Sequence, residues 1–357
     1  MGPTPKESGL DLDQERKLDF GDVLISPRLS SLNSRKDAIL TRTFVFPRTS
    51  TAWTVFPLMA SNMDATGTVA MAQALARSEA SGCLSKFIDN DTLVKFFSGA
   101  DSHHSFFSMG ITNDERQRLR TVSHRVPIAK ISIEVANGYI EALPRFVAGV
   151  RRDFPNAIIL AGSVCTPEGT INLLKAGADI ARVGIGSGSV CITRRVAGVG
   201  YPQLSAAMEC SQAAHEIGGF VCSDGGCTIP GDICKAFCAG ADFVMLGGML
   251  AGHDECEGRI TYKRSGKKKI PVSMEFYGMA SEIAQKKHYG GKPEYGAAEG
   301  KRVTVPYRGP VARTLSEILG GLRSMMTYID APDMGTIPSK AQFVRVGTQL
   351  NNVFGNA

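Results

Sequence analysis

The chain has 357 residues, of which 43% are hydrophobic and 21% are charged, and its formal net charge is +6. This composition is typical of a globular protein with one large domain or two small ones, and it does not indicate disorder. We expect neither a membrane span nor a secretory signal, and therefore a cytoplasmic protein, because no apolar run reaches about 18 residues and residues 1–16 are polar.

Eight short apolar runs rich in β-branched residues recur along the first two-thirds of the chain and predict strands. They are 54–60, 81–85, 105–109, 129–134, 157–164, 180–184, 220–223 and 243–247. The segments between them have helical spacing or helix-favouring composition, most clearly at 68–79, 166–176 and 231–239. Strands that alternate with helices indicate parallel β/α units, and apolar strands without clean alternation fit a sheet that is covered on both faces.

An open doubly wound sheet and a closed barrel both satisfy this pattern. Eight units within about 200 residues, many of which end in Gly, Ser or a charged residue, favour an α/β fold of the (β/α)8 TIM-barrel type. We expect a single barrel domain at 21–330, an N-terminal tail at 1–20 and a C-terminal tail at 331–357. The sequence shows no second domain, internal repeat or low-complexity segment.

The segment 250–310 follows the last predicted strand and is predicted to form a flap, since loops of this length are usually functional or disordered. It contains the basic run 263–269, which predicts a hairpin turn around Gly266 on a solvated surface. A nucleic-acid-binding patch is the alternative interpretation of this run. A helical pattern at 311–328 then completes the outer ring of the barrel.

Cys191 is the best candidate for a nucleophile. It follows a loop in which Gly184, Gly186 and Gly188 remove the Cβ atoms that would keep a ligand from the backbone, so that amide nitrogens or carbonyl oxygens can line the loop. A thiolate adds readily to an electrophilic carbon. A buried structural cysteine is the alternative. The nine cysteines contain no C-x-x-C pair, which argues against a disulfide framework and against a structural zinc site.

Other polar residues and glycines lie at the ends of predicted strands, which meet at one rim of a barrel. Asp224 lies between Ser223 and a Gly-Gly pair, and Gly247 and Gly248 follow the last strand. Barrels commonly bind phosphate through backbone amides at these two strand ends, so the pattern predicts a phosphate cradle. The fingerprint G-x-G-x-x-G is absent, so a nicotinamide cofactor would bind without a Rossmann unit.

Several strings resemble the IMP dehydrogenase / GMP reductase family, and the likeness extends from Leu18 almost to the C-terminus. They are SGSVCIT at 187–193, GVGYPQL at 198–204, SDGGC at 223–227, DFVMLGGMLAGH at 242–253, FYGM at 276–279 and EGK at 299–301. The reductase branch is the closer match. The chain has no room for an inserted regulatory domain between Lys86 and Ser105, and it has no Arg-Tyr pair between 252 and 309.

The resemblance implies NADPH-dependent reductive deamination of GMP to IMP and ammonia by a homotetramer. In that reaction Cys191 attacks C2 of guanine, Thr193 and Glu299 move the proton that lets ammonia leave, and Lys86 assists binding or leaving-group chemistry. The resemblance implies nucleotide contacts for Met63, Ser189, Asp224, Gly226, Gly247, Gly248, Tyr277, Gly278, Met279 and Tyr295. It implies cofactor contacts for Met109, Gly110, Glu134, Ala136 and Gly184, and a potassium ion on the carbonyl oxygens of Gly186, Gly188 and Cys191.

Several residues around the expected pocket depart from the usual reductase pattern. The family has His-Lys-His where this chain has Ser85, Lys86 and Phe87. It has Asp, Asn, Ser and Arg where this chain has Glu134, Ser163, Ala280 and Gly296. Ser187 and Ile192 look more like the dehydrogenase version of the Cys191 loop. We therefore hypothesise that the preference for purine or cofactor has drifted.

Two alternatives stay open. The Cys191 loop alone would permit an IMP dehydrogenase-type reaction with NAD, although Glu299 and the missing Arg-Tyr pair argue against it. A catalytically silent purine-nucleotide sensor would need only the phosphate cradle. The presence of Cys191, Thr193, Lys86 and Glu299 together argues against a sensor.

Overall fold

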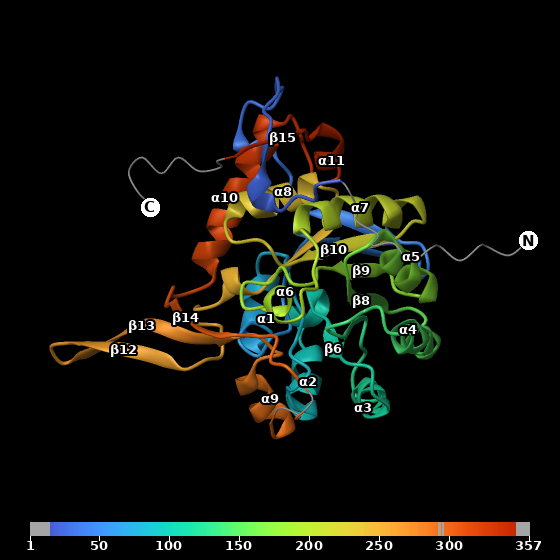
Figure 1. The fold of residues 1–357 in the computed structure, drawn as a ribbon, viewed down its shortest axis with the longest axis vertical. Coiled ribbons are helices and arrows are strands. Elements are labelled where there is room, and N and C mark those ends of the chain that lie inside the picture. The colour runs from blue at the N-terminus through green and yellow to red at the C-terminus, as the bar shows by residue number, and fades with distance from the viewer. Residues whose placement is uncertain (1–14, 292–293, 295, 348–357) are drawn as a thin grey trace, which may run out of the picture.

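A closed barrel of eight parallel strands forms the centre of the computed structural model, which describes residues 15–291, 294 and 296–347 (Figure 1). Around the barrel the strands follow the order β5-β4-β11-β10-β9-β8-β7-β6. The ring closes where Phe106 N donates to Gly82 O at 2.9 Å and Leu84 N donates to Phe106 O at 3.1 Å. The predicted (β/α)8 TIM barrel is confirmed. The strands are β4 (Leu58–Ala60), β5 (Ser81–Gly82), β6 (Phe107–Met109), β7 (Lys130–Glu134), β8 (Ile158–Val164), β9 (Ile180–Val183), β10 (Phe220–Asp224) and β11 (Phe243–Leu246).

Helices form the outer layer of the barrel, and the four helices named from the sequence are confirmed with shifts of a few residues at their ends. Polar side chains cap several first turns: Thr68 Oγ1 accepts from Met71 N, and Thr166 and Asp89 cap their helices in the same way. The helices are α1 (Val69–Ala76), α2 (Asn90–Phe97), α3 (Asn113–Ser123), α4 (Ala142–Asp153), α5 (Pro167–Ala176), α7 (Gln203–Glu216), α8 (Pro230–Cys238) and α10 (Ala312–Tyr328).

A β-hairpin of β2 (Arg42–Phe46) and β3 (Thr51–Val55) closes the N-terminal end of the barrel. Alternate residues of both strands are buried, so their aromatic side chains point into the barrel. The ring centroids of Phe44 and Phe243 lie 4.3 Å apart, and those of Trp53 and Phe243 lie 5.6 Å apart. We call these three residues together with Phe46 the aromatic plug.

The single strand expected at 54–60 is wrong, because its first residues belong to β3 and its last to β4. Pro57 lies between the two strands and has no N–H group to donate to a ladder. Leu58 N therefore bonds back to Phe56 O at 2.7 Å, and the chain turns from the hairpin into the barrel.

The chain on either side of the barrel is also packed against it. β1 (Val23–Ile25) pairs antiparallel with β15 (Phe343–Arg345), and α11 (Ile337–Lys340) lies next to α8. Met334 is buried in the cluster that covers α8 and α10. The segment 331–347, which we expected to be a tail, is therefore held by apolar contacts and a short ladder. Short 3-10 turns are η1 (Phe20–Asp22), η2 (Arg35–Asp37) and η3 (Ala100–His104).

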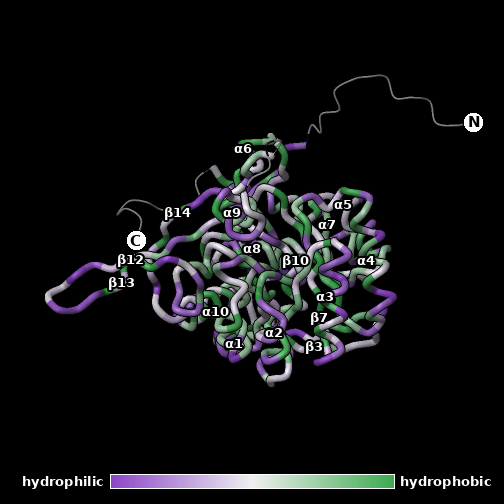
Figure 2. Tube along the Cα trace, turned by 90° about the horizontal axis from the view of Figure 1, so that it is seen from below, coloured by the Kyte–Doolittle hydropathy of each residue, from purple (hydrophilic) through white to green (hydrophobic). Residues whose placement is uncertain are grey.

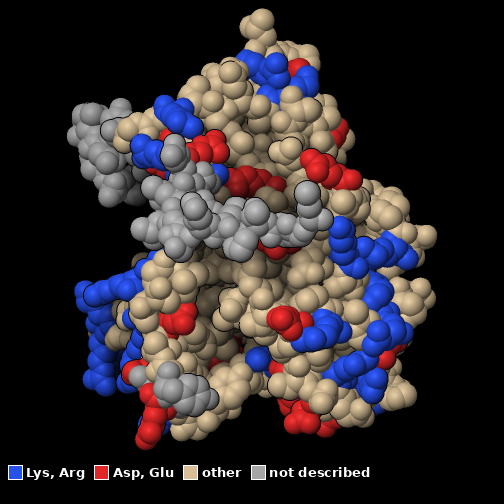
Figure 3. All heavy atoms as spheres, turned by 45° about the vertical axis from the view of Figure 1, so that its right-hand side comes forward, with Lys and Arg blue, Asp and Glu red and all other residues tan. Residues whose placement is uncertain are grey.

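The flap after β11 contains a hairpin that projects from the body of the molecule (Figure 1). The predicted basic turn is confirmed: Gly266 has a φ of +60°, and Arg264 pairs with Lys269 across the hairpin. Figure 2 shows that the tip is hydrophilic, and Figure 3 shows other Lys and Arg side chains gathered in groups with acidic residues between them. The flap elements are η4 (Gly248–Leu250), β12 (Ile260–Ser265), β13 (Lys268–Tyr277), α9 (Glu282–Tyr289) and β14 (Arg302–Pro306).

Candidate active site

The loop after β9 presents Cys191 at the C-terminal end of the barrel. Gly184 and Gly186 have φ angles of +157° and +79°, and a Cβ atom on Gly184 would overlap with the carbonyl oxygen of Asp224. Only glycine fits such a close approach. Cys191 is half-buried, its N–H group donates to Gly188 O at 3.0 Å, and the short helix α6 (Thr193–Val196) follows it.

Cys191, Thr193 and Glu299 form a hydrogen-bonded chain, which we call the Cys191 triad. Cys191 Sγ lies 3.2 Å from Thr193 Oγ1, and Thr193 Oγ1 donates to Glu299 Oε2 at 2.6 Å. The backbone fixes this alignment, since Ile192 N donates to Glu299 O at 2.8 Å. A carboxylate that reaches a thiol through one hydroxyl can move a proton beside a nucleophile. The structure thus places together three residues that are far apart in the sequence.

Lys86 lies after β5 and is held mainly by an acidic neighbour. Its Nζ lies 3.4 Å from Glu115 Oε1, and Arg118 donates to the Lys86 carbonyl oxygen. Burial acts to lower the pKa of Lys86, but the charges of Glu115 and Glu134 and the interaction with Tyr289 together outweigh it and raise the pKa above its ordinary value. Lys86 therefore remains a charged donor on the rim, where it is paired with Glu115.

The residues expected to contact the nucleotide gather on one side of the rim. A Cβ atom on Gly248 would collide with the Ser189 hydroxyl, and one on Gly247 would lie 3.1 Å from Met63 Sδ. Gly226 follows β10 beside them, with a φ of +79°. The end of β11 therefore packs closely against the loop after β4 and the Cys191 loop, and its glycines leave backbone amides that no Cβ atom shields from a phosphate.

The flap carries the other residues that are expected to contact the nucleotide, and those that the structure describes lie beside the Cys191 loop and the loop after β4. Tyr277 ends β13, and a Cβ atom on Gly278 would lie 3.0 Å from Val190 O in the Cys191 loop. Met279 Sδ lies 3.3 Å from a backbone amide of the loop after β4. Tyr295 lies outside the described residues.

The residues expected to contact the cofactor lie across the mouth of the barrel. Met109 and Glu134 end β6 and β7, and Gly110 and Ala136 follow these strands. Gly184 lies instead at the end of β9, in the nucleotide half. The expected cofactor residues other than Gly184 thus follow β6 and β7, and the expected nucleotide residues of the barrel follow β4, β9, β10 and β11. We call these two groups the cofactor half and the nucleotide half of the rim.

Asp64 anchors the flap to the barrel, and it is a residue for which the sequence analysis predicted no role. Its Oδ2 atom accepts from Tyr277 OH at 2.7 Å, from Lys287 Nζ at 3.0 Å and from His288 Nε2 at 2.7 Å. The His288 ring stacks on Phe87, with centroids 3.4 Å apart and an interplanar angle of 8°. Asp64 thus joins the loop after β4 to both β13 and α9. The sequence signal was its position in a polar string at a strand end.

Replacement of Asp64 by Asn is expected to loosen α9 and increase amide hydrogen exchange in this helix by about 10-fold or more, since charge-assisted hydrogen bonds of a buried carboxylate are among the stronger ones. Burial acts to raise the pKa of Asp64, but its bonds to His288, Tyr277 and Lys287 lower it below the ordinary value of 3.8. The stabilisation by this carboxylate is therefore present above pH 3.8 and is lost only as pH falls through the lower folded-state pKa.

A matched control is Asp330→Asn, which removes a carboxylate that bonds Ser31 and Lys340 far from the flap. That variant should leave exchange in α9 unchanged. Equal exchange rates for α9 in the wild type and in Asp64→Asn would show that Asp64 does not anchor the flap.

Arg182 is a second residue that was missed. It projects from β9 into the mouth, with 12% of its side chain exposed, and NH1 lies 2.8 Å from Glu134 Oε2. Its other nitrogens reach Asp224. The available sequence signal was a single charged residue within an otherwise apolar strand. The network links the cofactor half of the rim to the nucleotide half.

The Cys191 loop has the backbone chemistry that a potassium ion requires. Gly188 O accepts from Cys191 N, whereas the carbonyl oxygens of Gly186 and Cys191 accept no hydrogen bond from the described residues. Carbonyl oxygens suit a hard monovalent cation. Side-chain metal centres are a separate matter: residues 15–291, 294 and 296–347 contain no cluster of three or more His, Cys, Asp or Glu side chains suited to a metal ion.

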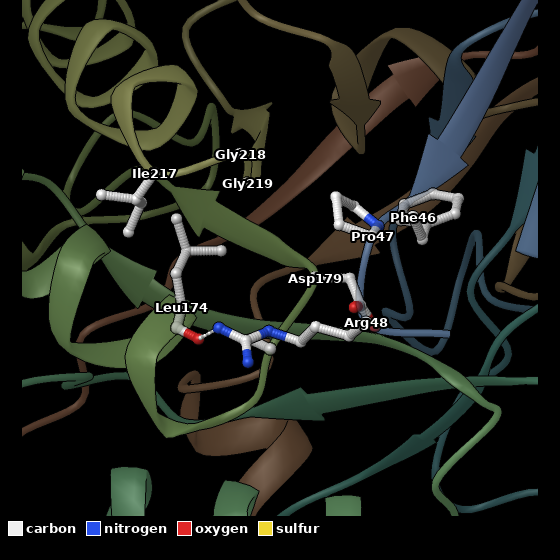
Figure 4. A pocket seen from close by; sticks show the side chains of 9 residues that line it. Phe46, Pro47, Arg48, Leu174, Asp179, Ile217, Gly218 and Gly219 are labelled. Carbon is white, nitrogen blue, oxygen red and sulfur yellow. Dashed lines mark hydrogen bonds between the residues drawn. The ribbon is translucent and has the colours of Figure 1, made fainter. Parts of the chain in front are cut away.

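A cavity of about 280 Å³ lies at the opposite end of the barrel (Figure 4). It is lined by residues that precede β9 and β10, including Asp179 and Gly219, and Arg48 crosses it to donate to Leu174 O at 2.6 Å. The cavity lies at the N-terminal end of the barrel and is therefore separate from the Cys191 triad, which lies at the C-terminal end. In the part of the chain that the structure describes, no helix has the length and apolar character needed to cross a membrane.

Comparisons with known proteins show the family to which the chain belongs. A family model described as the IMP dehydrogenase / GMP reductase domain matches residues 17–351. A GMP reductase of Ascaris suum is 46% identical over 349 residues, which cover 96% of this chain and 97% of that protein. A GMP reductase of Escherichia coli (strain K12 / DH10B) is also 46% identical over 349 residues, covering 97% and 99%. The match spans the barrel, the Cys191 loop and the flap, and the chain belongs to the IMP dehydrogenase / GMP reductase family.

Proposed function

We propose that this protein is a GMP reductase, which converts GMP to IMP and ammonia with NADPH as reductant. The hydrogen-bonded Cys191 triad is the observation that carries the proposal. The reaction needs a nucleophile, a proton donor for ammonia and a nucleotide-binding rim, and the residues proposed for these roles lie at one end of the barrel. Full-length similarity to proteins named GMP reductase supports the same reaction.

Cys191 is the nucleophile in the proposed reaction. Its sulfur forms a bond to C2 of guanine, and the bond from C2 to the exocyclic nitrogen breaks as ammonia leaves. A covalent intermediate divides one difficult substitution into two easier steps. The glycine-lined loop allows the purine to approach the sulfur, because no Cβ atom at Gly186 or Gly188 stands in the way.

Thr193 and Glu299 supply the proton for the leaving group. An amide anion is a very poor leaving group, so the nitrogen must be protonated as the bond breaks. The Thr193 hydroxyl lies between the Cys191 sulfur and the Glu299 carboxylate, and can pass a proton from one side to the other. Lys86 and Asp224 then hold the nucleotide on the rim.

The cofactor half of the rim has groups that fit NADPH. Glu134 offers a carboxylate that can accept hydrogen bonds from hydroxyl or amide groups. The Met109 side chain is 1% exposed and packs with Leu119 in the apolar layer beneath the helices, so Met109 would contact a cofactor through its backbone. When bound, NADPH supplies the hydride that replaces sulfur at C2 and frees the thiolate. A potassium ion held by the carbonyl oxygens of Gly186, Gly188 and Cys191 would stiffen the loop. We also propose that the protein is a homotetramer, which a sedimentation measurement would test.

We also propose a cytoplasmic location, because all nine cysteines are free thiols.

The test of the reaction is to mix the protein with GMP and NADPH and to measure NADPH oxidation, ammonia and IMP in one sample. The three should change in a 1:1:1 ratio, as the balanced reaction requires. A parallel sample with IMP and NAD tests the dehydrogenase alternative. Binding of GMP without turnover in either sample would instead support a sensor.

A further inference from the structure

The C-terminal end of helix α9 meets the loop after β5 in a cluster of three rings. The His288 ring stacks on Phe87, with centroids 3.4 Å apart. The Tyr289 ring meets both edge-on, with its centroid 5.9 Å from that of Phe87 and 6.4 Å from that of His288. Edge-to-face contact is a favoured arrangement of aromatic side chains. Phe87 belongs to the barrel and the other two residues belong to the flap, so the cluster holds the end of α9 against the barrel.

The ammonium group of Lys86 lies within reach of two of these rings. Lys86 Nζ is 5.4 Å from the centroid of the Phe87 ring and 6.0 Å from that of the Tyr289 ring. Both distances are within the range of a cation–π contact, which is stronger where the cation is shielded from water. The Lys86 side chain is only 21% exposed, and its charge is also paired with Glu115. Three neighbours therefore hold this ammonium group, and of these Tyr289 is the one that the flap supplies.

Tyr289 also affects the charge of Lys86. Burial acts to lower the pKa of Lys86, and after Glu115 the interactions with Tyr289 contribute most to raising it above its ordinary value. A lysine side chain is long and flexible, so it occupies one position only where its neighbours compensate for the loss of rotamer entropy. Tyr289 therefore favours both the charged form of Lys86 and its location on the rim.

The flap that carries Tyr289 also carries Glu299. Thr193 Oγ1 donates to Glu299 Oε2 at 2.6 Å, which joins this part of the flap to the Cys191 loop. Asp64 joins α9 to the loop after β4 through two further hydrogen bonds. A docked flap thus places Glu299 beside Thr193 and Tyr289 beside Lys86 at the same time. The two contacts lie in one segment of the chain, but they act on different residues of the rim.

We propose that Tyr289 is a positioning residue for Lys86, whose ring holds the ammonium group in place, so that Lys86 acts efficiently on the nucleotide only when α9 lies against the barrel. This inference rests on the proposed function, in which Lys86 holds the nucleotide on the rim. Tyr289 acts through Lys86 and is not itself a catalytic residue.

The contact is tested first without any reaction, by reductive methylation of lysines with isotopically labelled formaldehyde and nuclear magnetic resonance of the methyl groups. The variant Lys86→Arg identifies the Lys86 signal. In the wild type this signal should lie upfield of those of exposed lysines, because the rings of Phe87 and Tyr289 shield it. In Tyr289→Leu the signal should move downfield and the pKa of Lys86 should fall, because an interaction that raises this pKa is lost.

Two further variants show which part of the side chain acts. Tyr289→Phe keeps the ring and loses the hydroxyl, so most of the upfield shift should remain. Tyr262→Leu is the matched control, since Tyr262 is another exposed tyrosine of the flap and lies on the projecting hairpin. That variant should leave the Lys86 signal unchanged. Tyr289 is 63% exposed, so its replacement should leave the fold intact.

The effect on the reaction is tested by a double-mutant cycle. Tyr289→Leu should lower the rate of ammonia release from GMP without NADPH by about 3- to 30-fold, the range expected for loss of a cation–π contact and a hydrogen bond. The loss should divide between the rate at saturation and the dependence on GMP in the same way as for Lys86→Met. In the Lys86→Met background, Tyr289→Leu should have no further effect, because it acts through a residue that is already gone.

An unchanged Lys86 signal in Tyr289→Leu would overturn the inference. An equal loss of rate in the wild-type and Lys86→Met backgrounds would also overturn it, since that result indicates a structural role that does not involve Lys86. Failure of the proposed reaction would appear differently, as a wild type that binds GMP and releases no ammonia. The Lys86 signal would still report the contact with Tyr289 in that case, so the two failures are distinguishable.

Discussion

Replacement of Cys191 by Ala is expected to reduce kcat for GMP by at least about 10,000-fold, because it removes the atom that forms the covalent bond. GMP should still bind with an affinity close to that of the wild type, because the ribose and phosphate contacts come from other residues. Stopped-flow measurement of NADPH oxidation and calorimetric titration with GMP test the two halves of this expectation separately.

A second readout uses the first half-reaction alone. Without NADPH, the wild type should release up to one ammonia per active site from GMP, and Cys191→Ala should release none. Cys256→Ala is the matched control, since burial raises the pKa of the Cys256 thiol to about 11 and its Sγ bonds to Leu250 O at 3.0 Å. This variant should retain activity. Turnover in Cys191→Ala at the wild-type rate would falsify covalent catalysis.

Replacement of Glu299 by Gln is expected to lower kcat by between about 100- and 10,000-fold, the usual range for loss of a general acid or base. Gln can still accept the 2.6 Å bond from Thr193 Oγ1, so the loop geometry should persist while proton transfer is lost. The change should appear in the release of ammonia without NADPH, which precedes hydride transfer in the proposed reaction.

Thr193→Val should have an effect of similar size, and the double variant should be little worse than either single one, because the two side chains form one path. Glu282→Gln is the control, as it neutralises an exposed carboxylate on the same flap. If ammonia release from Glu299→Gln kept the wild-type rate, the proton would have to come from another group.

The barrel could be predicted from sequence because its signal is repeated. Eight apolar runs that alternate with helices are compatible with few folds other than a (β/α)8 barrel. The carboxyl ends of parallel strands in such a barrel meet at one rim. The Cys191 loop and Asp224 could be placed on that rim for the same reason. Thr193 and Glu299 could be paired only through the family resemblance, because no local pattern joins residues so far apart in the chain.

Three features could not be predicted because each depends on tertiary contacts. They are the β2–β3 hairpin at the N-terminal end of the barrel, the contacts of Asp64 with the flap, and the ion pairs of Arg182. The alternation in β2 and β3 is visible in the sequence, but nothing there indicates that this face fills the end of the barrel. Arg182 appeared as an exception within an apolar strand, and its partners Glu134 and Asp224 are 48 and 42 residues away. Only the closed ring places the three together.

The substitutions around the pocket take on a physical meaning in the fold. Phe87 stands where the family has a histidine, and its ring stacks on His288 of the flap, so an imidazole from another element lies at this place. Ala280 O accepts from Glu299 N at 3.2 Å, and Ser163 O accepts from Gly138 N at 2.9 Å, through backbone atoms that any side chain would provide. The hypothesis of a drifted purine or cofactor preference remains a prediction, and the steady-state constants for GMP and NADPH would test it.

The aromatic plug has a consequence for the route by which molecules enter and leave. Its side chains fill the N-terminal end of the barrel with rings in contact, so the described residues leave no passage through the centre. Every reactant and product must therefore use the same opening. A nucleotide and a cofactor would therefore both enter and leave at the C-terminal end. Ammonia would leave at that end as well, where Cys191, Thr193 and Glu299 lie.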